Sequence, residues 1–197
     1  MTATTTTTTT TMTRPSALAP TQSSRIVLRQ AFVGITLVAQ AVIDGPIGPL
    51  TALATKQGIA GLWFDNQTHH PGKLDAPLDA GNAHIASIQR WLDAYWAGGE
   101  PSPHGVPLDL HGTPFQRAVW LALLAIPFGR SRSYGEIAAQ VGPGAAPRAT
   151  GAAVGRNPVS ILVPCHRVIG ADGSLVGYAG GLQRKQRLLQ HEGVLLA

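Results

Sequence analysis

Residues 133–156, SYGEIAAQVGPGAAPRATGAAVGR, decide the fold of the second half of this 197-residue chain. Ser133, followed three residues later by Glu136, forms a capping box that predicts the start of a short helix, and Gly142 ends it. Pro147 can begin a second helix that fills the rest of the stretch. Helix, glycine-containing turn, helix is the helix-turn-helix pattern. The second helix is rich in alanine and glycine and therefore thin. This thinness favours close packing within the domain or close approach to DNA, and the pattern leaves both open.

The chain before this stretch predicts one more helix and, further upstream, a sheet. Thr113-Pro114-Phe115-Gln116 is a capping box with proline at the first helical position, and this helix ends before Pro127. Apolar residues recur at helical spacing from Ile85 to Trp96, so we expect a helix there that Gly98-Gly99 stops. Short apolar runs predict strands, and turn signals separate the later ones. These runs are residues 26–28, 34–38, 50–54 and 59–64.

The expected fold class is α+β with two domains. Residues 1–24 contain eight consecutive threonines and little to bury, so we expect a disordered tail. Residues 25–98 are expected to form a small β-sheet plus a helix, and the proline-rich residues 99–110 a linker. Residues 111–197 are expected to form a mostly helical, winged-helix-like domain that carries the helix-turn-helix.

Basic residues are concentrated in the C-terminal third. Residues 1–128 hold seven basic and seven acidic side chains, whereas residues 129–197 hold eight basic and three acidic ones. Such an excess indicates a polyanionic partner, most often nucleic acid, although a merely solvated basic face would look the same. No apolar run is long enough to span a bilayer, which argues against a membrane partner.

Val163-Pro164-Cys165-His166 contains the only cysteine of the chain. A single cysteine excludes an internal disulfide and a multi-cysteine zinc site, and it fits a reducing, cytoplasmic compartment. A thiol next to an imidazole is a candidate nucleophile, because the thiolate is the reactive form. The alternative is that Cys165 is simply a small buried hydrophobic residue.

Several motifs together resemble one family, the methylated-DNA–protein-cysteine methyltransferases (O6-alkylguanine-DNA alkyltransferases). The resemblance covers about residues 107–193, and residues 44–50 look like the start of the family's N-terminal domain. The shared motifs are Gly112-Thr113-Pro114-Phe115-Gln116, Asn157-Pro158-Val159, Val163-Pro164-Cys165-His166-Arg167-Val168, Gly177-Tyr178-Ala179-Gly180-Gly181 and His191-Glu192-Gly193.

The resemblance implies a suicidal DNA repair protein with S-methyltransferase activity. Such a protein moves the alkyl group of O6-alkylguanine in double-stranded DNA to its own cysteine in one irreversible turnover, with no cofactor and no metal. It acts as a monomer from the minor groove and flips the damaged base out of the duplex. Whether O4-alkylthymine is also a substrate stays open.

The resemblance also implies a catalytic set. Cys165 is the alkyl acceptor, and His166 takes its proton through a bound water. Glu192 orients His166, and Asn157 braces the turn that leads from the second helix to the cysteine.

A second implied set recognises DNA. Tyr134 rotates a phosphate and donates a hydrogen bond to the flipped base, while Arg148 enters the stack in place of the guanine. The backbone of Cys165 and Val168 accepts from the exocyclic amine of the base.

Tyr178 and Ala179 line the pocket and meet the guanine oxygen. Many members of the family carry serine where Ala179 stands, so a hydroxyl contact is absent here, although a backbone amide contact survives. The structural zinc site of some members cannot form with one cysteine.

Three other readings stay open at this point. A Cys-His-Glu thiol hydrolase would turn over repeatedly and would need an oxyanion hole, for which the sequence offers no motif. A non-catalytic binder of alkylated DNA, as in alkyltransferase-like proteins, would have no need of Cys165. A plain helix-turn-helix regulator would have no use for the Pro164-Cys165-His166 arrangement.

Overall fold

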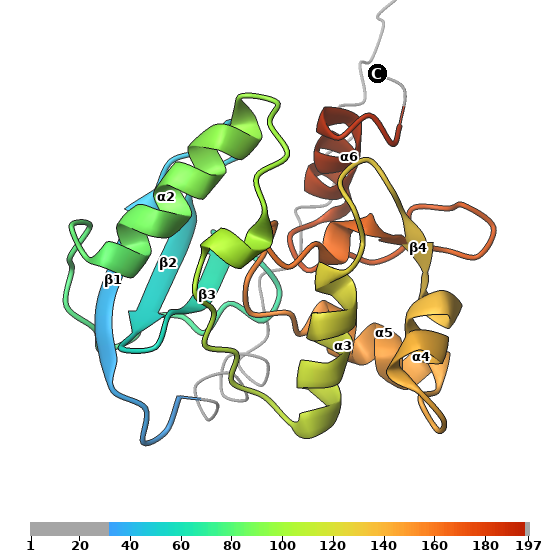
Figure 1. Ribbon diagram of the computed structural model, residues 1–197, viewed down its shortest axis with the longest axis horizontal. Helices are drawn as coiled ribbons and strands as arrows, with labels where there is room; N and C mark the ends of the chain where they lie inside the picture. The colour runs from blue at the N-terminus through green and yellow to red at the C-terminus, as the bar shows by residue number, and fades with distance from the viewer. Residues whose placement is uncertain (1–31, 196–197) are drawn as a thin grey trace, which may run out of the picture.

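The computed structural model describes residues 32–195. It has two parts that lie side by side, a sheet with one helix and a cluster of four helices (Figure 1). The predicted α+β class is confirmed by this arrangement. The expected tail at 1–24 and the apolar run at 26–28 lie outside the described residues.

The sheet of the first part is antiparallel, with strand order β1-β2-β3. Its strands are β1 (Leu37–Ile43), β2 (Leu50–Thr55) and β3 (Ile59–Phe64). The expected strand at 34–38 was wrong in its bounds. The strand starts three residues later and continues to Ile43, because these residues pair with β2 across the turn that follows. Helix α2 (Ala83–Trp96) packs its apolar stripe against the sheet.

Strand β3 continues its hydrogen bonding beyond the three-stranded sheet. The expected linker, residues 99–110, contains a short 3-10 helix (Pro103–Gly105) and then runs along β3. Ile59 donates to the Pro107 carbonyl over 2.8 Å, and Asp109 donates to the Ile59 carbonyl over 2.9 Å. A Cβ at Gly58 would stand 2.5 Å from the Pro107 oxygen, so this close approach requires glycine.

The second part contains four helices, and the first three match the helices expected from the sequence. They are α3 (Pro114–Leu124), α4 (Tyr134–Val141), α5 (Pro147–Gly155) and α6 (Leu182–His191). Both predicted capping boxes are present, at Thr113 with Gln116 and at Ser133 with Glu136. A short parallel pair, β4 (Arg132–Ser133) with β5 (Val168–Ile169), joins the start of α4 to the segment after the cysteine.

Helix α5 uses its small residues on two faces. Thr150, Ala153 and Val154 are buried, and Trp120 of α3 donates its indole N–H to the Ala153 carbonyl over 2.9 Å. Ala149 and Ala152 are exposed. The thin helix therefore packs closely inside the domain on one side and exposes small side chains of alanine on the other.

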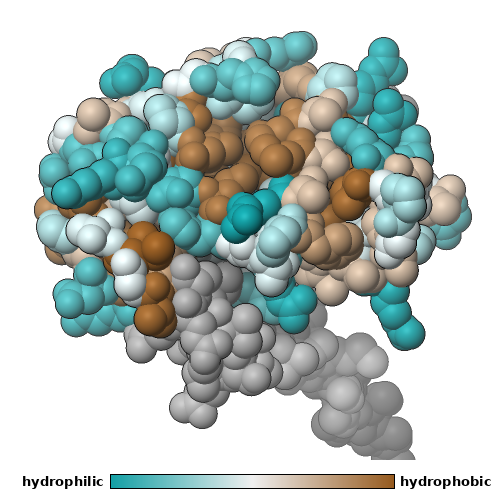
Figure 2. All heavy atoms as spheres, turned by 60° about the horizontal axis from the view of Figure 1, so that its bottom comes forward, coloured by the Kyte–Doolittle hydropathy of each residue, from teal (hydrophilic) through white to brown (hydrophobic). Residues whose placement is uncertain are grey.

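One hydrophobic core runs through both parts. It joins Leu62 and Phe64 of β3 to Val119 of α3, to Val159 after α5, and to Leu188 of α6. On the face shown in Figure 2, one group of hydrophobic residues lies near the middle of the molecule with hydrophilic residues beside it. No helix in the described part of the chain is both long and apolar enough to cross a bilayer.

Candidate active site

Cys165 lies at the first position of a 3-10 turn (Cys165–Arg167), directly after Pro164. Asn157, two residues after the end of α5, holds this turn. Its side-chain amide donates to the Cys165 sulfur over 3.0 Å and to the Val163 carbonyl over 2.8 Å, and its oxygen accepts from the Val159 amide over 3.0 Å. These bonds join the end of α5 to the thiol.

The backbone before the cysteine is strained. Ile161 is buried with φ 68°, a left-handed conformation that a β-branched residue rarely adopts. The neighbouring residues are fixed by the N-terminal part of the chain. Val159 pairs with Leu62 of β3, and the Ser160 hydroxyl donates to Gln67 over 2.8 Å. The sheet therefore keeps the loop in this shape.

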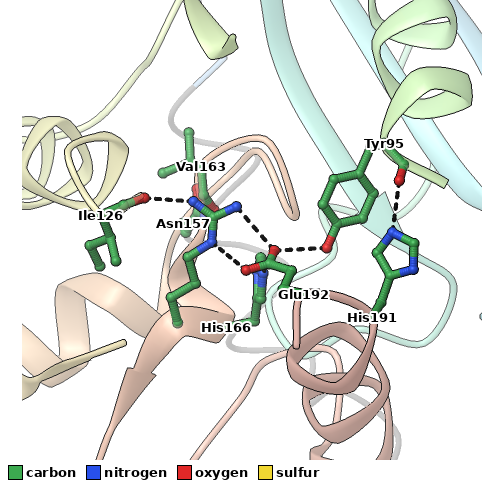
Figure 3. A network of polar contacts seen from close by, with 8 residues as sticks. Tyr95, Ile126, Asn157, Val163, His166, His191 and Glu192 are labelled. Carbon is green, nitrogen blue, oxygen red and sulfur yellow. Dashed lines mark hydrogen bonds and ion pairs between the residues drawn. The ribbon is translucent and has the colours of Figure 1, made fainter. Parts of the chain in front are cut away.

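His166 is fully buried and lies 2.7 Å, through Nε2, from a Glu192 carboxylate oxygen (Figure 3). Arg167 donates to both oxygens of the same carboxylate, from Nε over 2.7 Å and from Nη2 over 3.0 Å. Its Nη1 donates to the Ile126 carbonyl over 2.6 Å. Nε2 of His166 is thus the donor to Glu192, which leaves Nδ1 as the acceptor nitrogen. Nδ1 is buried and has no hydrogen-bond partner within residues 32–195.

Burial sets the protonation states of this group. It raises the pKa of the Cys165 thiol to about 11, and the Asn157 hydrogen bond and the Lys185 charge oppose this only in part. It lowers the pKa of His166 from its ordinary value, and Glu192 offsets this only in part. Burial also raises the pKa of Glu192, but contacts from His166 and Arg167 outweigh it and hold that pKa at about 2. At neutral pH the site is a thiol, a neutral imidazole and a carboxylate.

Lys185 is a functional candidate that the sequence does not reveal, because it lies between Arg184 and Arg187 in a charged stretch that is typical of a solvated helix face. Its side chain is fully buried, and its ammonium donates to the carbonyls of Val168, Val176 and Gly177 over 2.5, 2.7 and 3.3 Å. Burial lowers its pKa to about 8. The signal was present in the spacing, since Lys185 lies on the same helical stripe as the buried Leu188 and Leu189.

A pocket of about 230 Å³ opens above Cys165. Its walls come from four segments of the chain. They are Thr68 and His69 after β3, Tyr134 of α4, Gly151, Val154 and Gly155 of α5, and Gly177, Tyr178 and Ala179 of the loop before α6. Burial, followed by the nearby Cys165, raises the pKa of Tyr134, so its hydroxyl stays a donor. The pocket can take a planar group and present it to the sulfur.

The structure brings most of the expected site residues together. Cys165, Tyr134, Tyr178 and Ala179 line the pocket, with Asn157 beneath the thiol. His166 follows the cysteine in the chain and contacts Glu192. The exceptions are Arg148 and Val168, neither of which lines the pocket.

Arg148 is exposed in the first turn of α5. The Val168 carbonyl already accepts from Lys185. Arg148 is therefore placed to meet a partner outside the pocket. A carbonyl oxygen has two lone pairs, so the Val168 oxygen can accept one more hydrogen bond beside that from Lys185.

Three pocket or site residues were missed because they come from the N-terminal part. Thr68 and His69 line the pocket, and the Thr68 amide donates to the Ala179 carbonyl over 2.8 Å. Tyr95 of α2 donates its hydroxyl to Glu192 over 2.8 Å. Nothing in their spacing marks these residues, since only the folded chain brings them near Cys165. No group of three or more His, Cys, Asp or Glu side chains within residues 32–195 is arranged to hold a metal ion.

The chain is similar to one family of known proteins. The family model described as 6-O-methylguanine DNA methyltransferase, DNA binding domain, matches residues 114–194. The methylated-DNA–protein-cysteine methyltransferase of Mycobacterium tuberculosis is 50% identical over 150 residues, which cover 76% of this chain and 89% of the relative. The protein of the same name from Methanosarcina acetivorans is 43% identical over 155 residues, 78% of this chain and 97% of the relative.

Solved structures agree with these sequence matches. The crystal structure of Mycobacterium tuberculosis OGT in complex with DNA is similar with a TM-score of 0.73 and 48% identity, over 79% of this chain and 93% of that one. A methyltransferase structure from the archaeon Pyrococcus kodakaraensis, 24% identical with a TM-score of 0.59, shares the fold.

Proposed function

The chain belongs to the methylated-DNA–protein-cysteine methyltransferases, and we propose that it repairs O6-alkylguanine in double-stranded DNA by taking the alkyl group onto its own Cys165, once per molecule. The observation that carries the proposal is the position of the Cys165 sulfur. It lies at a pocket of the size of a base and accepts a hydrogen bond from Asn157, and the next residue of the chain, His166, is paired with Glu192.

The proposed reaction is a displacement at saturated carbon. The Cys165 proton passes to Nδ1 of His166 through a bridging water, and Glu192 stabilises the resulting imidazolium. The sulfur then forms a bond to the alkyl carbon as the carbon–O6 bond breaks, and the electron pair stays on the guanine. Solvent supplies the proton that the released base needs. The thioether is stable in water, so the protein is consumed.

A resting thiol suits this order of events. Because burial keeps the pKa of Cys165 near 11, the reactive thiolate forms only when a bound base makes proton transfer productive. Tyr134 lines the pocket as a phenol and is the candidate donor to the leaving base. Tyr178 and Ala179 line the pocket where the guanine oxygen would lie.

The exposed face of α5 is the proposed contact with the minor groove. Its small residues allow a close approach, and Arg148 in its first turn is placed to fill the space that the flipped base leaves. The backbone of Cys165 and Val168 is proposed to accept from the exocyclic amine of the base.

We also propose that the protein works as a monomer in the cytoplasm. All the proposed catalytic groups come from one chain, and a reducing compartment keeps the single cysteine free to react.

The test is mass spectrometry of the protein after incubation with a duplex that contains one O6-methylguanine. We expect every molecule to gain one methyl group, located on the peptide that carries Cys165. The Cys165→Ala variant should gain none, while it still binds the methylated duplex. An unmethylated duplex is the substrate control.

Each other outcome selects a different activity. Release of methyl products over many turnovers would indicate a hydrolase. A wild-type protein that binds the methylated duplex and gains no mass would be a non-catalytic binder. A methyl group found on another residue would overturn the assignment of Cys165.

A further inference from the structure

Tyr95 connects the N-terminal part of the chain to the proposed acceptor site. Its hydroxyl donates to a Glu192 oxygen over 2.8 Å, and the same oxygen lies 2.7 Å from Nε2 of His166 (Figure 3). Glu192 lies 97 residues further along the chain. It therefore receives hydrogen bonds from three side chains, those of His166, Arg167 and Tyr95.

The tyrosine is held rigidly enough to orient a partner. Its side chain is fully buried, with aromatic rings on several sides. The ring centroids of Trp91, Trp96, Phe128 and His191 lie 5.4, 4.9, 6.0 and 4.8 Å from its own. Burial, followed by the charge of Glu192, raises the pKa of Tyr95 well above its ordinary value, so the hydroxyl is protonated and donates at neutral pH.

Glu192 needs such a support because of its position. It is the C-terminal cap of α6, so no further helical turn fixes its backbone. Its carboxylate is set by what its oxygens contact. If one of those contacts is lost, the carboxylate can rotate, and the imidazole it orients can rotate with it.

We infer that Tyr95 is a positioning residue of the alkyl-acceptor site, which fixes Glu192 and through it the orientation and basicity of His166. The inference rests on the proposed function for its effect on alkyl transfer. It also makes the N-terminal part of the chain a component of the reactive centre.

The direction of the effect on His166 follows from the charges around it. The groups that act on its pKa are Glu192, Arg167 and Lys185, and Tyr178 lies against it with ring centroids 6.5 Å apart. Tyr95 and Arg167 both draw charge from the carboxylate. Without the Tyr95 hydroxyl, the carboxylate attracts an imidazolium more strongly, so the His166 pKa should rise.

The test variant is Tyr95→Phe, which removes one oxygen and keeps the ring. We expect single-turnover methyl transfer to slow by about tenfold, as is usual for the loss of a supporting hydrogen bond. The acid limb of the rate profile should move to higher pH. The affinity for unmethylated duplex should not change. Trp96→Phe is the matched control, because Trp96 contacts Tyr95 and His191 and its indole N–H has no hydrogen-bond partner within residues 32–195.

A second measurement does not depend on transfer. The His166 ring is titrated by NMR in the free protein, where Tyr95→Phe should raise its pKa and Trp96→Phe should not. In a Glu192→Gln background, Tyr95→Phe should have no further effect on the titration, since the two residues act through one contact.

The outcomes separate the two proposals. Wild-type protein that leaves Cys165 unmethylated contradicts the proposed function, and the NMR titration still decides the role of Tyr95. An unchanged His166 titration in Tyr95→Phe, or an equal change in Trp96→Phe, would overturn that role.

Discussion

Under the proposed function, Cys165 is a nucleophile that stays unreactive until its substrate arrives. A depressed pKa would make the thiol generally reactive, whereas burial here raises it to about 11. Under that proposal, reactivity comes from proton transfer to His166 within the pocket. The rate of transfer should therefore follow the protonation of His166, not the ordinary titration of a thiol.

This gives a prediction for pH. His166 must be neutral to accept a proton, and burial lowers its pKa below the ordinary 6.5, so the neutral form persists into more acidic solution. We expect the single-turnover rate at saturating DNA to stay level from about pH 8 to about pH 6.5 and to fall only below that range. Rapid-quench assays measure it. A fall centred above pH 6.5 would contradict the assigned state of His166.

The buried ammonium of Lys185 gives a second prediction for a single residue. Its ammonium is the hydrogen-bond donor to the Val168, Val176 and Gly177 carbonyls, and its charge opposes the rise in the Cys165 pKa. In Lys185→Met, the carbonyls lose this donor. We expect a loss of about 1–3 kcal/mol in the free energy of unfolding, measured in urea, together with slower methyl transfer.

The matched control is Arg187→Met, which removes the same charge from an exposed position on the same helix. It should leave both quantities close to wild type. If the two variants behave alike, the buried contacts of Lys185 are not what matters.

At the scale of single residues, the sequence revealed those with a local motif and missed those brought in by folding. Pro164-Cys165-His166 is a local signal, and Glu192 followed from a family motif. Tyr95, Thr68 and His69 carry no such signal. The burial of Arg167 was equally hidden, because its partner Glu192 lies 25 residues away in sequence.

At the scale of elements, capping chemistry was the most informative signal. The boxes at Thr113 and Ser133 fixed the starts of α3 and α4, because cap hydrogen bonds are local. Strand β1 was misplaced because its bounds depend on pairing with β2, which is not local. The contact of the expected linker with β3 is also a non-local pairing, so local sequence signals could not predict it.

Helix α5 yields a prediction about its exposed face. Ala152 is exposed there, while Ala153 and Val154 are buried. Ala152→Glu adds a bulky negative group to the surface proposed to enter the minor groove. We expect DNA binding to weaken by about tenfold in fluorescence anisotropy, with little change in unfolding.

Gln186→Glu serves as the control, because it makes the same change of charge at an exposed position on α6. In Figure 1, α6 lies at the top of the second part, and α5 lies in its lower half beside α3 and α4. Equal weakening by both variants would mean that net charge, and not the face of α5, governs binding.

At the scale of the whole molecule, the two parts share one core and several polar contacts. Arg184 of α6 is the clearest link between them. It donates to the carbonyls of Ile47 and Gly180 over 3.1 Å each, and its guanidinium lies 4.6 Å from the centroid of the Phe64 ring. A chain joined in this way should unfold as one unit.

Native-state hydrogen exchange tests this cooperativity residue by residue. The most protected amides of β2 and of α3 should open with the same free energy, because neither part keeps its buried surface without the other. Arg184→Ala should lower both values equally, by about 1 kcal/mol, since it removes contacts that exist only when the parts are together. Arg187→Ala, from the exposed side of α6, should lower neither. If the amides of α3 open well before those of β2, the helical part unfolds while the sheet persists. The sheet would then keep its buried surface without the helical part.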